Sequence, residues 1–415
     1  MEEFSRRRQD QPRLPSPAMP AGGGEPQPHH PVVPLAARSP DELPHAAAPT
    51  FGVEEEFFVV DADTRQATAQ APEVLAAARP TGSELCAEIT RFQVEAASPV
   101  CQTAPELSTH VASARRTLTE AAAERALAVV ATGTAVLGDV GSAPLSEGRR
   151  YRAIAERFGA LRDAHVVCGC HVHVGIADRE VALAVANHLR PWLPTLLALT
   201  ANSPFRRGRD TGHASWRSII WARLPSAGPP PWLGSVAEHE RAVTEMLRTG
   251  AILDRRMVYW DVRLSEHLPT LEIRVGDVAG TAEEAVLFAV LVRGLVTVAL
   301  AQVAAGDPAP PLSDRSLRLA MWRAARDGLE GHALDPFSAD LVPARRQLDR
   351  LVEAAMPGLG ADGEGELVER LLLRLFSVGS GAHRQRAAYA RRGRLTDVLD
   401  LLVRQTTHGL DAADL

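Results

Sequence analysis

The sequence predicts an α+β fold, because expected strands concentrate in the first two thirds of the ordered chain and expected helices in the last third. Short segments that alternate apolar and polar residues take turns with longer Ala-, Leu- and Arg-rich segments of helical period. The 415 residues suffice for one large domain or two ordinary ones. We find no internal repeat, so a solenoid or propeller is not expected.

Residues 1–48 differ from the rest of the chain, since they are rich in Pro, Gly, Ala and Arg and have almost no periodicity. Such a segment buries too little apolar surface to offset the entropy lost on ordering, so we expect a disordered extension. Residues 49–415 are expected to form a single domain.

The expected elements follow one another in a clear order. Strands are predicted at 51–60, 83–97, 130–136, 165–176, 255–265 and 269–278. The short connection His267-Leu268-Pro269 between the last two favours an antiparallel hairpin. Helices are predicted near 103–129, 179–201, 236–249, 281–304, 313–327, 341–355 and 364–376, with shorter ones after Gly381 and Arg394. The stretch 204–232 reads as a long loop, whose Trp residues argue against disorder and whose Arg residues suit an anionic ligand.

Composition excludes several classes of function. The net charge of −6 and the pI near 6.2 give no long-range attraction to nucleic acid or to an acidic membrane. The longest apolar run, 285–303, is interrupted by Arg293 and is expected to be a buried helix rather than a membrane span. All 45 basic residues are Arg, which excludes mechanisms that need a lysine amine. Without a secretory signal or a cysteine framework, we expect reduced thiols in a cytoplasmic protein.

Four predicted strands each place a pair of polar side chains on one face, because side chains alternate along a strand. These pairs are Glu54 with Glu56, Gln93 with Glu95, His171 with His173, and Glu272 with Arg274. Each pair has a structural alternative, such as a solvated strand face, a structural HxH or a surface cross-strand pair. Four such strands together favour one shared site. Grouped carboxylates repel one another unless a cation neutralises them, and oxygen ligands suit Mg²⁺ or Mn²⁺. Cys168 and Cys170 beside the two histidines leave zinc as the less favoured alternative.

A set of motifs in this order resembles the type 2 glutamate–cysteine ligases, a family of carboxylate–amine ligases. The motifs are GVEEEF, QVEAASPV, ATGT, CGCHVHVG, NSPF-RRGRDTGHASWR, YWDVR-S, PTLEIRVGDV, WRAARDGL and GAHRQ, and they run from about residue 50 to the end. The resemblance implies a glutamine synthetase-like catalytic fold, a curved antiparallel sheet with helices on its convex face. It implies an ATP-dependent ligase that uses Mg²⁺, or Mn²⁺, and passes through an acyl phosphate.

The resemblance also implies roles for individual residues. Expected metal ligands are Glu54, Glu56, Glu88, Glu95 and Glu272. Expected catalytic groups are Arg274, Glu272 and His171, with Arg217, Arg274 and His173 contacting the nucleotide. Implied substrates are ATP, glutamate, and cysteine or another amine, and a homodimer is one expectation. One departure from the family pattern is His213, which stands where the family usually has an aromatic residue, and this leaves the accepted amine open.

Two rival functions remain open at the level of sequence. A metal-dependent hydrolase would use HxH plus acids, but HxH comes late in this chain and further strand-end His or Lys residues are missing. A non-catalytic nucleotide- or amino-acid-binding protein would not need the complete set of carboxylates. A ligase with a different acid or amine substrate is the third alternative.

Overall fold

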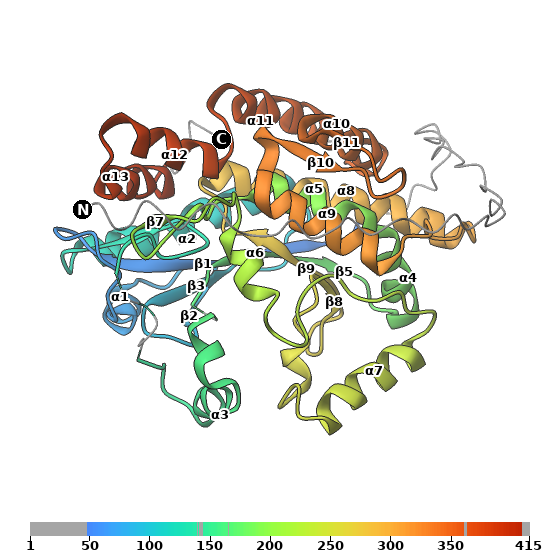
Figure 1. Ribbon diagram of the computed structural model, residues 1–415, viewed down its shortest axis with the longest axis horizontal. Coiled ribbons are helices and arrows are strands. Elements are labelled where there is room, and N and C mark those ends of the chain that lie inside the picture. Colours follow the sequence, from blue (N-terminus) through green and yellow to red (C-terminus); the bar gives the residue numbers. More distant parts are fainter. Residues whose placement is uncertain (1–47, 139, 141–143, 165, 361–362, 409–415) are drawn as a thin grey trace, which may run out of the picture. The chain divides into compact units, whose positions relative to one another are not determined.

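A computed structural model describes residues 48–408 apart from 139, 141–143, 165 and 361–362 (Figure 1). The described residues belong to one compact unit. The predicted disordered extension lies outside them, except for its last residue.

One antiparallel sheet organises the described residues, with strand order β2-β3-β1-β5-β9-β8 and with β4 also paired to β1. Its strands are β1 (Phe51–Asp61), β2 (Glu84–Ala87), β3 (Gln93–Ala97), β4 (Leu127–Val130), β5 (Gly169–Gly175), β8 (Val262–Leu264) and β9 (Thr270–Asp277). The pairing of β8 with β9 confirms the predicted hairpin. Two small hairpins complete the strands: β6 (Phe205–Arg206) with β7 (Arg209–Asp210), and β10 (His332–Leu334) with β11 (Leu341–Pro343).

Several predicted strand boundaries are wrong. The segment 83–97 is two strands, because the chain turns between β2 and β3 before pairing back on itself. The predicted strand 130–136 is displaced, since the paired residues are Leu127–Val130 and only the isolated bridge of Thr134 with Val167 follows. The predicted strand 255–265 contains a 3₁₀ turn at Arg255–Met257 before the short β8. In each case strand-favouring residues also occur in the connections, so the local pattern does not mark where pairing begins or ends.

The helices follow the predicted order more closely. They are α1 (Ala71–Ala77), α2 (Ala104–Ala123), α3 (Arg149–Phe158), α4 (Arg179–Leu189), α5 (Leu193–Thr200), α6 (Trp216–Trp221), α7 (Val236–Arg248), α8 (Ala282–Ala304), α9 (Asp314–Asp327), α10 (Ala344–Ala355), α11 (Glu364–Val378), α12 (Gly381–Arg392) and α13 (Leu395–Thr406). Three of them were missed: α1, α3 and α6.

Two predicted helices are longer than the observed ones. The segment 103–129 stops at Ala123 because the chain turns into β4. The segment 179–201 is interrupted by a 3₁₀ turn at Arg190–Trp192, where Pro191 and Pro194 cannot donate backbone hydrogen bonds. Helix starts were easier to predict, since residues such as Thr103, Thr281 and Ser313 cap them with side-chain oxygens.

A layer of helices built on α8 covers one face of the sheet, and other helices lie on the opposite side. In Figure 1, α5, α8 and α9 lie on one side of the strands, whereas α3, α6 and α7 lie on the other. Helix α8 packs against β1 and β5 and against α2, α4, α10 and α11. By length and composition alone α8 could cross a membrane, but 67% of its most apolar stretch is buried inside the protein. The expected buried helix is therefore what the structure contains.

A buried ion pair fastens β1 to the helix layer. Glu55 pairs with Arg115 of α2, with Nη2 to Oε1 at 2.5 Å and Nε to Oε2 at 2.9 Å. Arg115 also donates to the carbonyl of Ala279 at 2.8 Å. Both side chains are almost fully buried. Because Glu55 alternates with its neighbours along β1, this pair fixes Glu54 and Glu56 on the opposite face.

We predict that Arg115→Leu destabilises the protein by about 3–5 kcal/mol, because the substitution leaves the Glu55 carboxylate buried without a partner. Chemical denaturation measures this change. The double variant Glu55→Leu/Arg115→Leu should recover part of the loss, since it removes both charges. A single variant as stable as the wild type would contradict the prediction.

Candidate metal and nucleotide site

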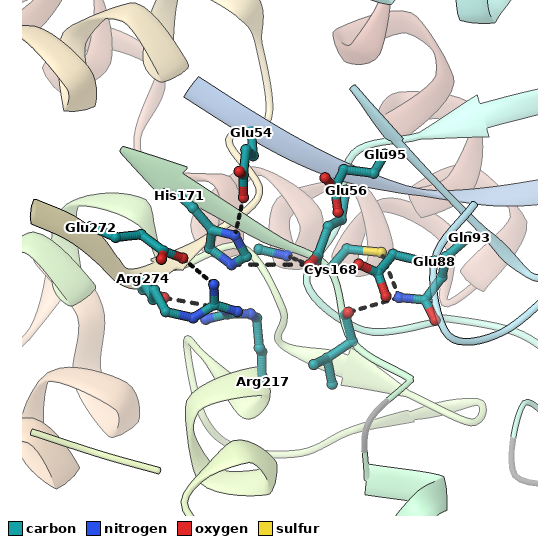
Figure 2. Close-up of polar contacts among 12 residues, drawn as sticks. Glu54, Glu56, Glu88, Gln93, Glu95, Cys168, His171, Arg217, Glu272 and Arg274 are labelled. Carbon is teal, nitrogen blue, oxygen red and sulfur yellow. Dashed lines mark hydrogen bonds and ion pairs between the residues drawn. The ribbon is translucent and has the colours of Figure 1, made fainter. Parts of the chain in front are cut away.

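Polar side chains from several strands converge on the face opposite the helix layer, which we call the site face. In an antiparallel sheet, residues paired across two strands share a face. Glu54 pairs with His171, and Glu56 pairs with Glu95. On the next pair of strands, His173 lies opposite Glu272. The structure thus brings these predicted residues together, as Figure 2 shows for most of them.

Glu54, His173 and Glu272 form one group that could hold a metal ion, with one ligand atom from each within 4.8 Å of the others. Glu54 lies at its centre, 3.1 Å from His173 Nε2 and 3.2 Å from His171 Nδ1. The other nitrogen of His173 lies 2.9 Å from the Thr270 hydroxyl, which orients the ring. One histidine and two carboxylates make a mixed ligand set for a divalent cation.

A second group consists of Glu56, Glu88 and Glu95, again with ligand atoms within 4.8 Å of one another. Glu88 comes from the loop that interrupts the predicted strand 83–97, and this break lets its carboxylate reach the other two. Glu56 also accepts a hydrogen bond from the Gly169 amide at 2.7 Å. Three carboxylates form an oxygen-only ligand set, which a hard cation such as Mg²⁺ prefers.

The two groups differ in their electrostatics. Burial raises the pKa of Glu56 to about 8, and the nearby Glu88 adds to the increase. Burial and Glu88 likewise hold the pKa of Glu95 well above its usual range. For Glu54, burial acts in the same direction, but its contacts with His171 and His173 outweigh it and lower the pKa. Without a cation, the oxygen-only group therefore tends to hold protons, and a bound divalent cation would replace them and stabilise the ionised carboxylates.

Glu272 is the most heavily neutralised carboxylate of the site. Arg263 donates to it through Nε at 2.8 Å and Nη2 at 3.1 Å, and Arg274 pairs with it as well. Burial alone would raise the pKa of Glu272, but Arg274 and Arg263 outweigh burial and lower it. Sequence reasoning missed Arg263, although its place opposite Glu272 follows from the predicted hairpin.

His171 is neutral at physiological pH, because burial and Arg274 lower its pKa to about 4. Its Nδ1 faces Glu54, whereas its Nε2 is buried without a hydrogen-bond partner and lies 4.0 Å from Glu56. A proton on Nδ1 leaves a lone pair on Nε2, the arrangement of a metal-ligating imidazole with a carboxylate behind it.

Arg217 reaches the site from α6, on the same side of the sheet. Its guanidinium donates to the carbonyl of Arg274 at 3.2 Å and lies 4.0 Å from Asp277. A side chain at Gly169 would place its Cβ 2.4 Å from Arg217 Nη2, so this glycine makes room for the arginine. Arg217 is therefore largely occupied by backbone carbonyls, with Nε left unpartnered.

Asp277 anchors the segment that leads into α6 and so to Arg217. The sequence did not predict this role for Asp277. Its carboxylate accepts hydrogen bonds from the Asn202 amide at 2.9 Å and from the hydroxyls of Ser203 and Ser215 at 2.6 and 2.8 Å. Ser203 in turn accepts from the Arg217 amide at 3.0 Å.

A change of register between β5 and β9 explains the position of Asp277. The register shifts between Cys170 and Val172, so that Arg274 and Val275 both lie opposite His171. This bulge turns Asp277 onto the site face, opposite Gly169. A register shift of this kind leaves no mark in the apolar pattern, so sequence could not have located it.

The two cysteines of CGCHVHVG do not join the histidines. Cys170 lies opposite Glu55, so its thiol is on the helix side of the sheet. Cys168 lies 3.6 Å from the Gln93 amide nitrogen, which also donates to the Val167 carbonyl at 2.8 Å. Both thiols are free and buried. The geometry disfavours the zinc alternative.

His213, the departure from the family pattern, packs its ring against Trp216 with 5.0 Å between ring centroids. Its Nδ1 lies 3.1 Å from the Thr211 carbonyl, and its own carbonyl accepts from Arg386 at 2.9 Å. His213 therefore joins the segment that leads to α6 both to α6 itself and to α12.

Known proteins resemble this chain in both sequence and fold. The sequence profile described as "Glutamate-cysteine ligase family 2" matches residues 50–401. The chain is 46% identical over 356 residues to "Putative glutamate--cysteine ligase 2-1" of Rhodococcus jostii (strain RHA1), covering 86% of this chain and 96% of that protein. It is 45% identical over 385 residues to "Putative glutamate--cysteine ligase 2-2" of Saccharopolyspora erythraea, covering 92% and 97%.

Two solved structures share the fold. The glutamate–cysteine ligase of Francisella tularensis in complex with AMP gives a TM-score of 0.64 at 11% identity, over 89% of this chain and 91% of that one. A bifunctional glutathione synthetase of Pasteurella multocida gives 0.61 at 15% identity, over 88% and 53%. The expected glutamine synthetase-like α+β fold is confirmed.

We predict a pH-dependent difference in stability between the metal-free wild type and Glu56→Gln. Because the pKa of Glu56 rises from 4.5 in the unfolded chain to about 8, its contribution is present below pH 4.5 and is lost as the pH approaches 8. The glutamine variant should therefore gain relative stability from pH 5 to 8, by up to about 1.4 kcal/mol per pH unit. Thermal melts in chelator-treated buffer measure this gain. Saturating Mn²⁺ should remove the wild-type decline, and a constant difference across this range would contradict the prediction.

Proposed function

The chain belongs to glutamate–cysteine ligase family 2, and from this membership we propose that it is an ATP-dependent carboxylate–amine ligase that joins the γ-carboxylate of glutamate to an amine. The observation that carries the proposal is the convergence of two metal-ligand groups on one sheet face, with Arg263 and Arg274 beside them. Such a face can hold divalent cations and a triphosphate together.

The proposed metal ligands are Glu54 and Glu272 with His173 in one group, and Glu56, Glu88 and Glu95 in the other. The raised pKa values of Glu56 and Glu95 fit a site that is completed by a cation. Mg²⁺ or Mn²⁺ bound there would neutralise the β- and γ-phosphates of ATP and make the γ-phosphorus more electrophilic.

Arg274 is proposed to contact the phosphoryl group that moves. Burial acts to lower its pKa, but Glu272, Glu54 and Glu56 raise it above the ordinary value, so the guanidinium stays charged. Its Nε has no hydrogen-bond partner and remains available to an anion. A fixed cation in a water-poor site stabilises the charge that develops during phosphoryl transfer.

Arg217 is a weaker candidate for direct contact with the nucleotide or a substrate carboxylate, because the guanidinium already donates to carbonyls of β9. Its charge still lies close to the site, where it acts to lower the pKa of Glu56. His171, neutral and with a free Nε2, is proposed to contact a metal or a phosphate oxygen.

The reaction then follows from the chemistry of the substrates. The carboxylate oxygen of the acid attacks the γ-phosphorus of ATP, ADP leaves, and an acyl phosphate forms. The amine nitrogen attacks the acyl carbon, phosphate leaves, and the nitrogen loses a proton to give the amide. The protein contributes positioning and charge neutralisation more than covalent chemistry.

The choice of glutamate and cysteine rests on the names of the relatives. His213, the departure from the family pattern, packs on Trp216 at the start of the helix that carries Arg217, so the accepted amine stays open. A ligase with another acid or amine is therefore the second candidate. We propose a cytoplasmic enzyme that binds no nucleic acid, and a homodimer stays an expectation.

A screen of acid and amine pairs with ATP and Mg²⁺, scored for a new amide by mass spectrometry and for ADP release, tests this function. We expect ADP release that depends on the acid, and an amide that appears only when acid and amine are both present. A metal-dependent hydrolase would instead act without ATP and respond to a zinc chelator. ATP binding without turnover for any pair would favour the non-catalytic alternative.

We predict that Glu272→Gln and Arg274→Ala each abolish turnover without unfolding the protein, since the first removes a proposed metal ligand and the second the proposed phosphoryl contact. Acid-dependent ADP release measures activity, and circular dichroism checks the fold. The exposed Glu353→Gln on α10 serves as a matched control that should keep full activity. Wild-type rates in either site variant would refute the assignment.

A further inference from the structure

Asp261 is a buried acid that the proposed metal and phosphate chemistry does not use. It lies immediately before β8, and only 7% of it is exposed. Its carbonyl accepts the Arg274 amide hydrogen bond at 2.8 Å, which continues the register in which Arg263 lies opposite Glu272. Asp261 therefore lies opposite Arg274, and its side chain is on the site face.

The ion pairs around Asp261 are unequally distributed. Two arginines, Arg263 and Arg274, both pair with Glu272, whereas Asp261 makes no ion pair within the described part of the chain. Its Oδ2 is buried and has no hydrogen-bond partner. A buried acceptor without a partner is costly, so the position favours a ligand that supplies a donor.

The surroundings restrict what that ligand can be. A carboxylate accepts hydrogen bonds, so it suits either a metal ion or a donor group of a substrate. The charged groups that act on Asp261 are Arg217 and Arg274, which repel a divalent cation more strongly than a singly charged donor group. Burial raises the pKa of Asp261 to about 7 while the arginines oppose the increase, so an added cationic donor would stabilise the ionised form.

We propose that Asp261 binds the ammonium group of an amino-acid substrate. This inference rests on the proposed function, in which both the acid and the amine substrate carry such a group. The ammonium can be that of the acid, which would place the γ-carboxylate toward Arg274, or that of the incoming amine. The two sources share one chemistry, and the experiment separates them.

The test compares Asp261→Asn with the wild type in calorimetric titrations of the full chain, with Mg²⁺ and a non-hydrolysable ATP analogue present. Two pairs of probes differ in the ammonium group: glutamate with glutarate, and cysteine with 3-mercaptopropionate. We expect the wild type to prefer the amino acid in one pair and the variant to lose about tenfold or more of that preference. The probe pair in which the preference is lost identifies the substrate that supplies the ammonium group.

Control measurements distinguish binding of the ammonium group from an indirect role in which Asp261 only positions Arg274. The affinity for the ATP analogue should stay the same in Asp261→Asn, and so should that for the probe lacking ammonium. The exposed Asp349→Asn on α10 should behave as the wild type throughout. Thermal melting should be unchanged or higher, since an amide is cheaper to bury than a carboxylate.

The inference is overturned if the wild type has no preference in either pair, or if Asp261→Asn keeps the preference. It is also overturned if the variant lowers the affinity for the ATP analogue and for every probe equally, because Asp261 would then only position Arg274. The titrations need no turnover, so they decide this role separately from the ADP-release and amide assays that decide the proposed function.

Discussion

The crowding of carboxylates on one sheet face is the constraint on which the rest of the structure depends. Glu56, Glu88 and Glu95 approach one another closely in a buried setting, which is unfavourable unless protons or cations reduce their repulsion. The neighbouring carboxylates, by contrast, have partners, since Arg263 and Arg274 pair with Glu272 and two histidines contact Glu54. A cation bound at the proposed site would relieve this repulsion and stabilise the folded protein.

The helix layer makes that arrangement possible. The pair of Glu55 with Arg115 joins β1 to α2, and the apolar residues of α8 pack against β1 and β5. With one face of the sheet covered in this way, alternation along each strand leaves the other face for polar groups. The segment before α6 contacts α9 and α12 and is anchored by Asp277, and it leads into α6 on the side of the site face (Figure 1). The same sheet thus provides both the hydrophobic core and the site.

The elements that sequence predicted well are those with a strong local signal. Alternation in β1 and β9 placed Glu54, Glu56 and Glu272 on one face, and capping residues marked the starts of long helices. The elements that were predicted wrongly have local sequence signals that tertiary contacts override. The turn between β2 and β3, which brings Glu88 to Glu56, contains the strand-favouring Ile89, Thr90 and Phe92, so only pairing reveals it. The short α6, which carries Arg217, lies within a stretch of loop-like composition.

By itself, the sequence determined which residue types share a strand face, because alternation is a property of the backbone and needs no partner. Through its motifs it also indicated the family and the set of site carboxylates. Only the tertiary structure decided how these faces meet. The register shift opposite His171, the double pairing of Glu272 and the unpaired oxygen of Asp261 arise from contacts between distant segments. Such contacts depend on how strands align and which charges compete for one partner, and no local pattern encodes that competition.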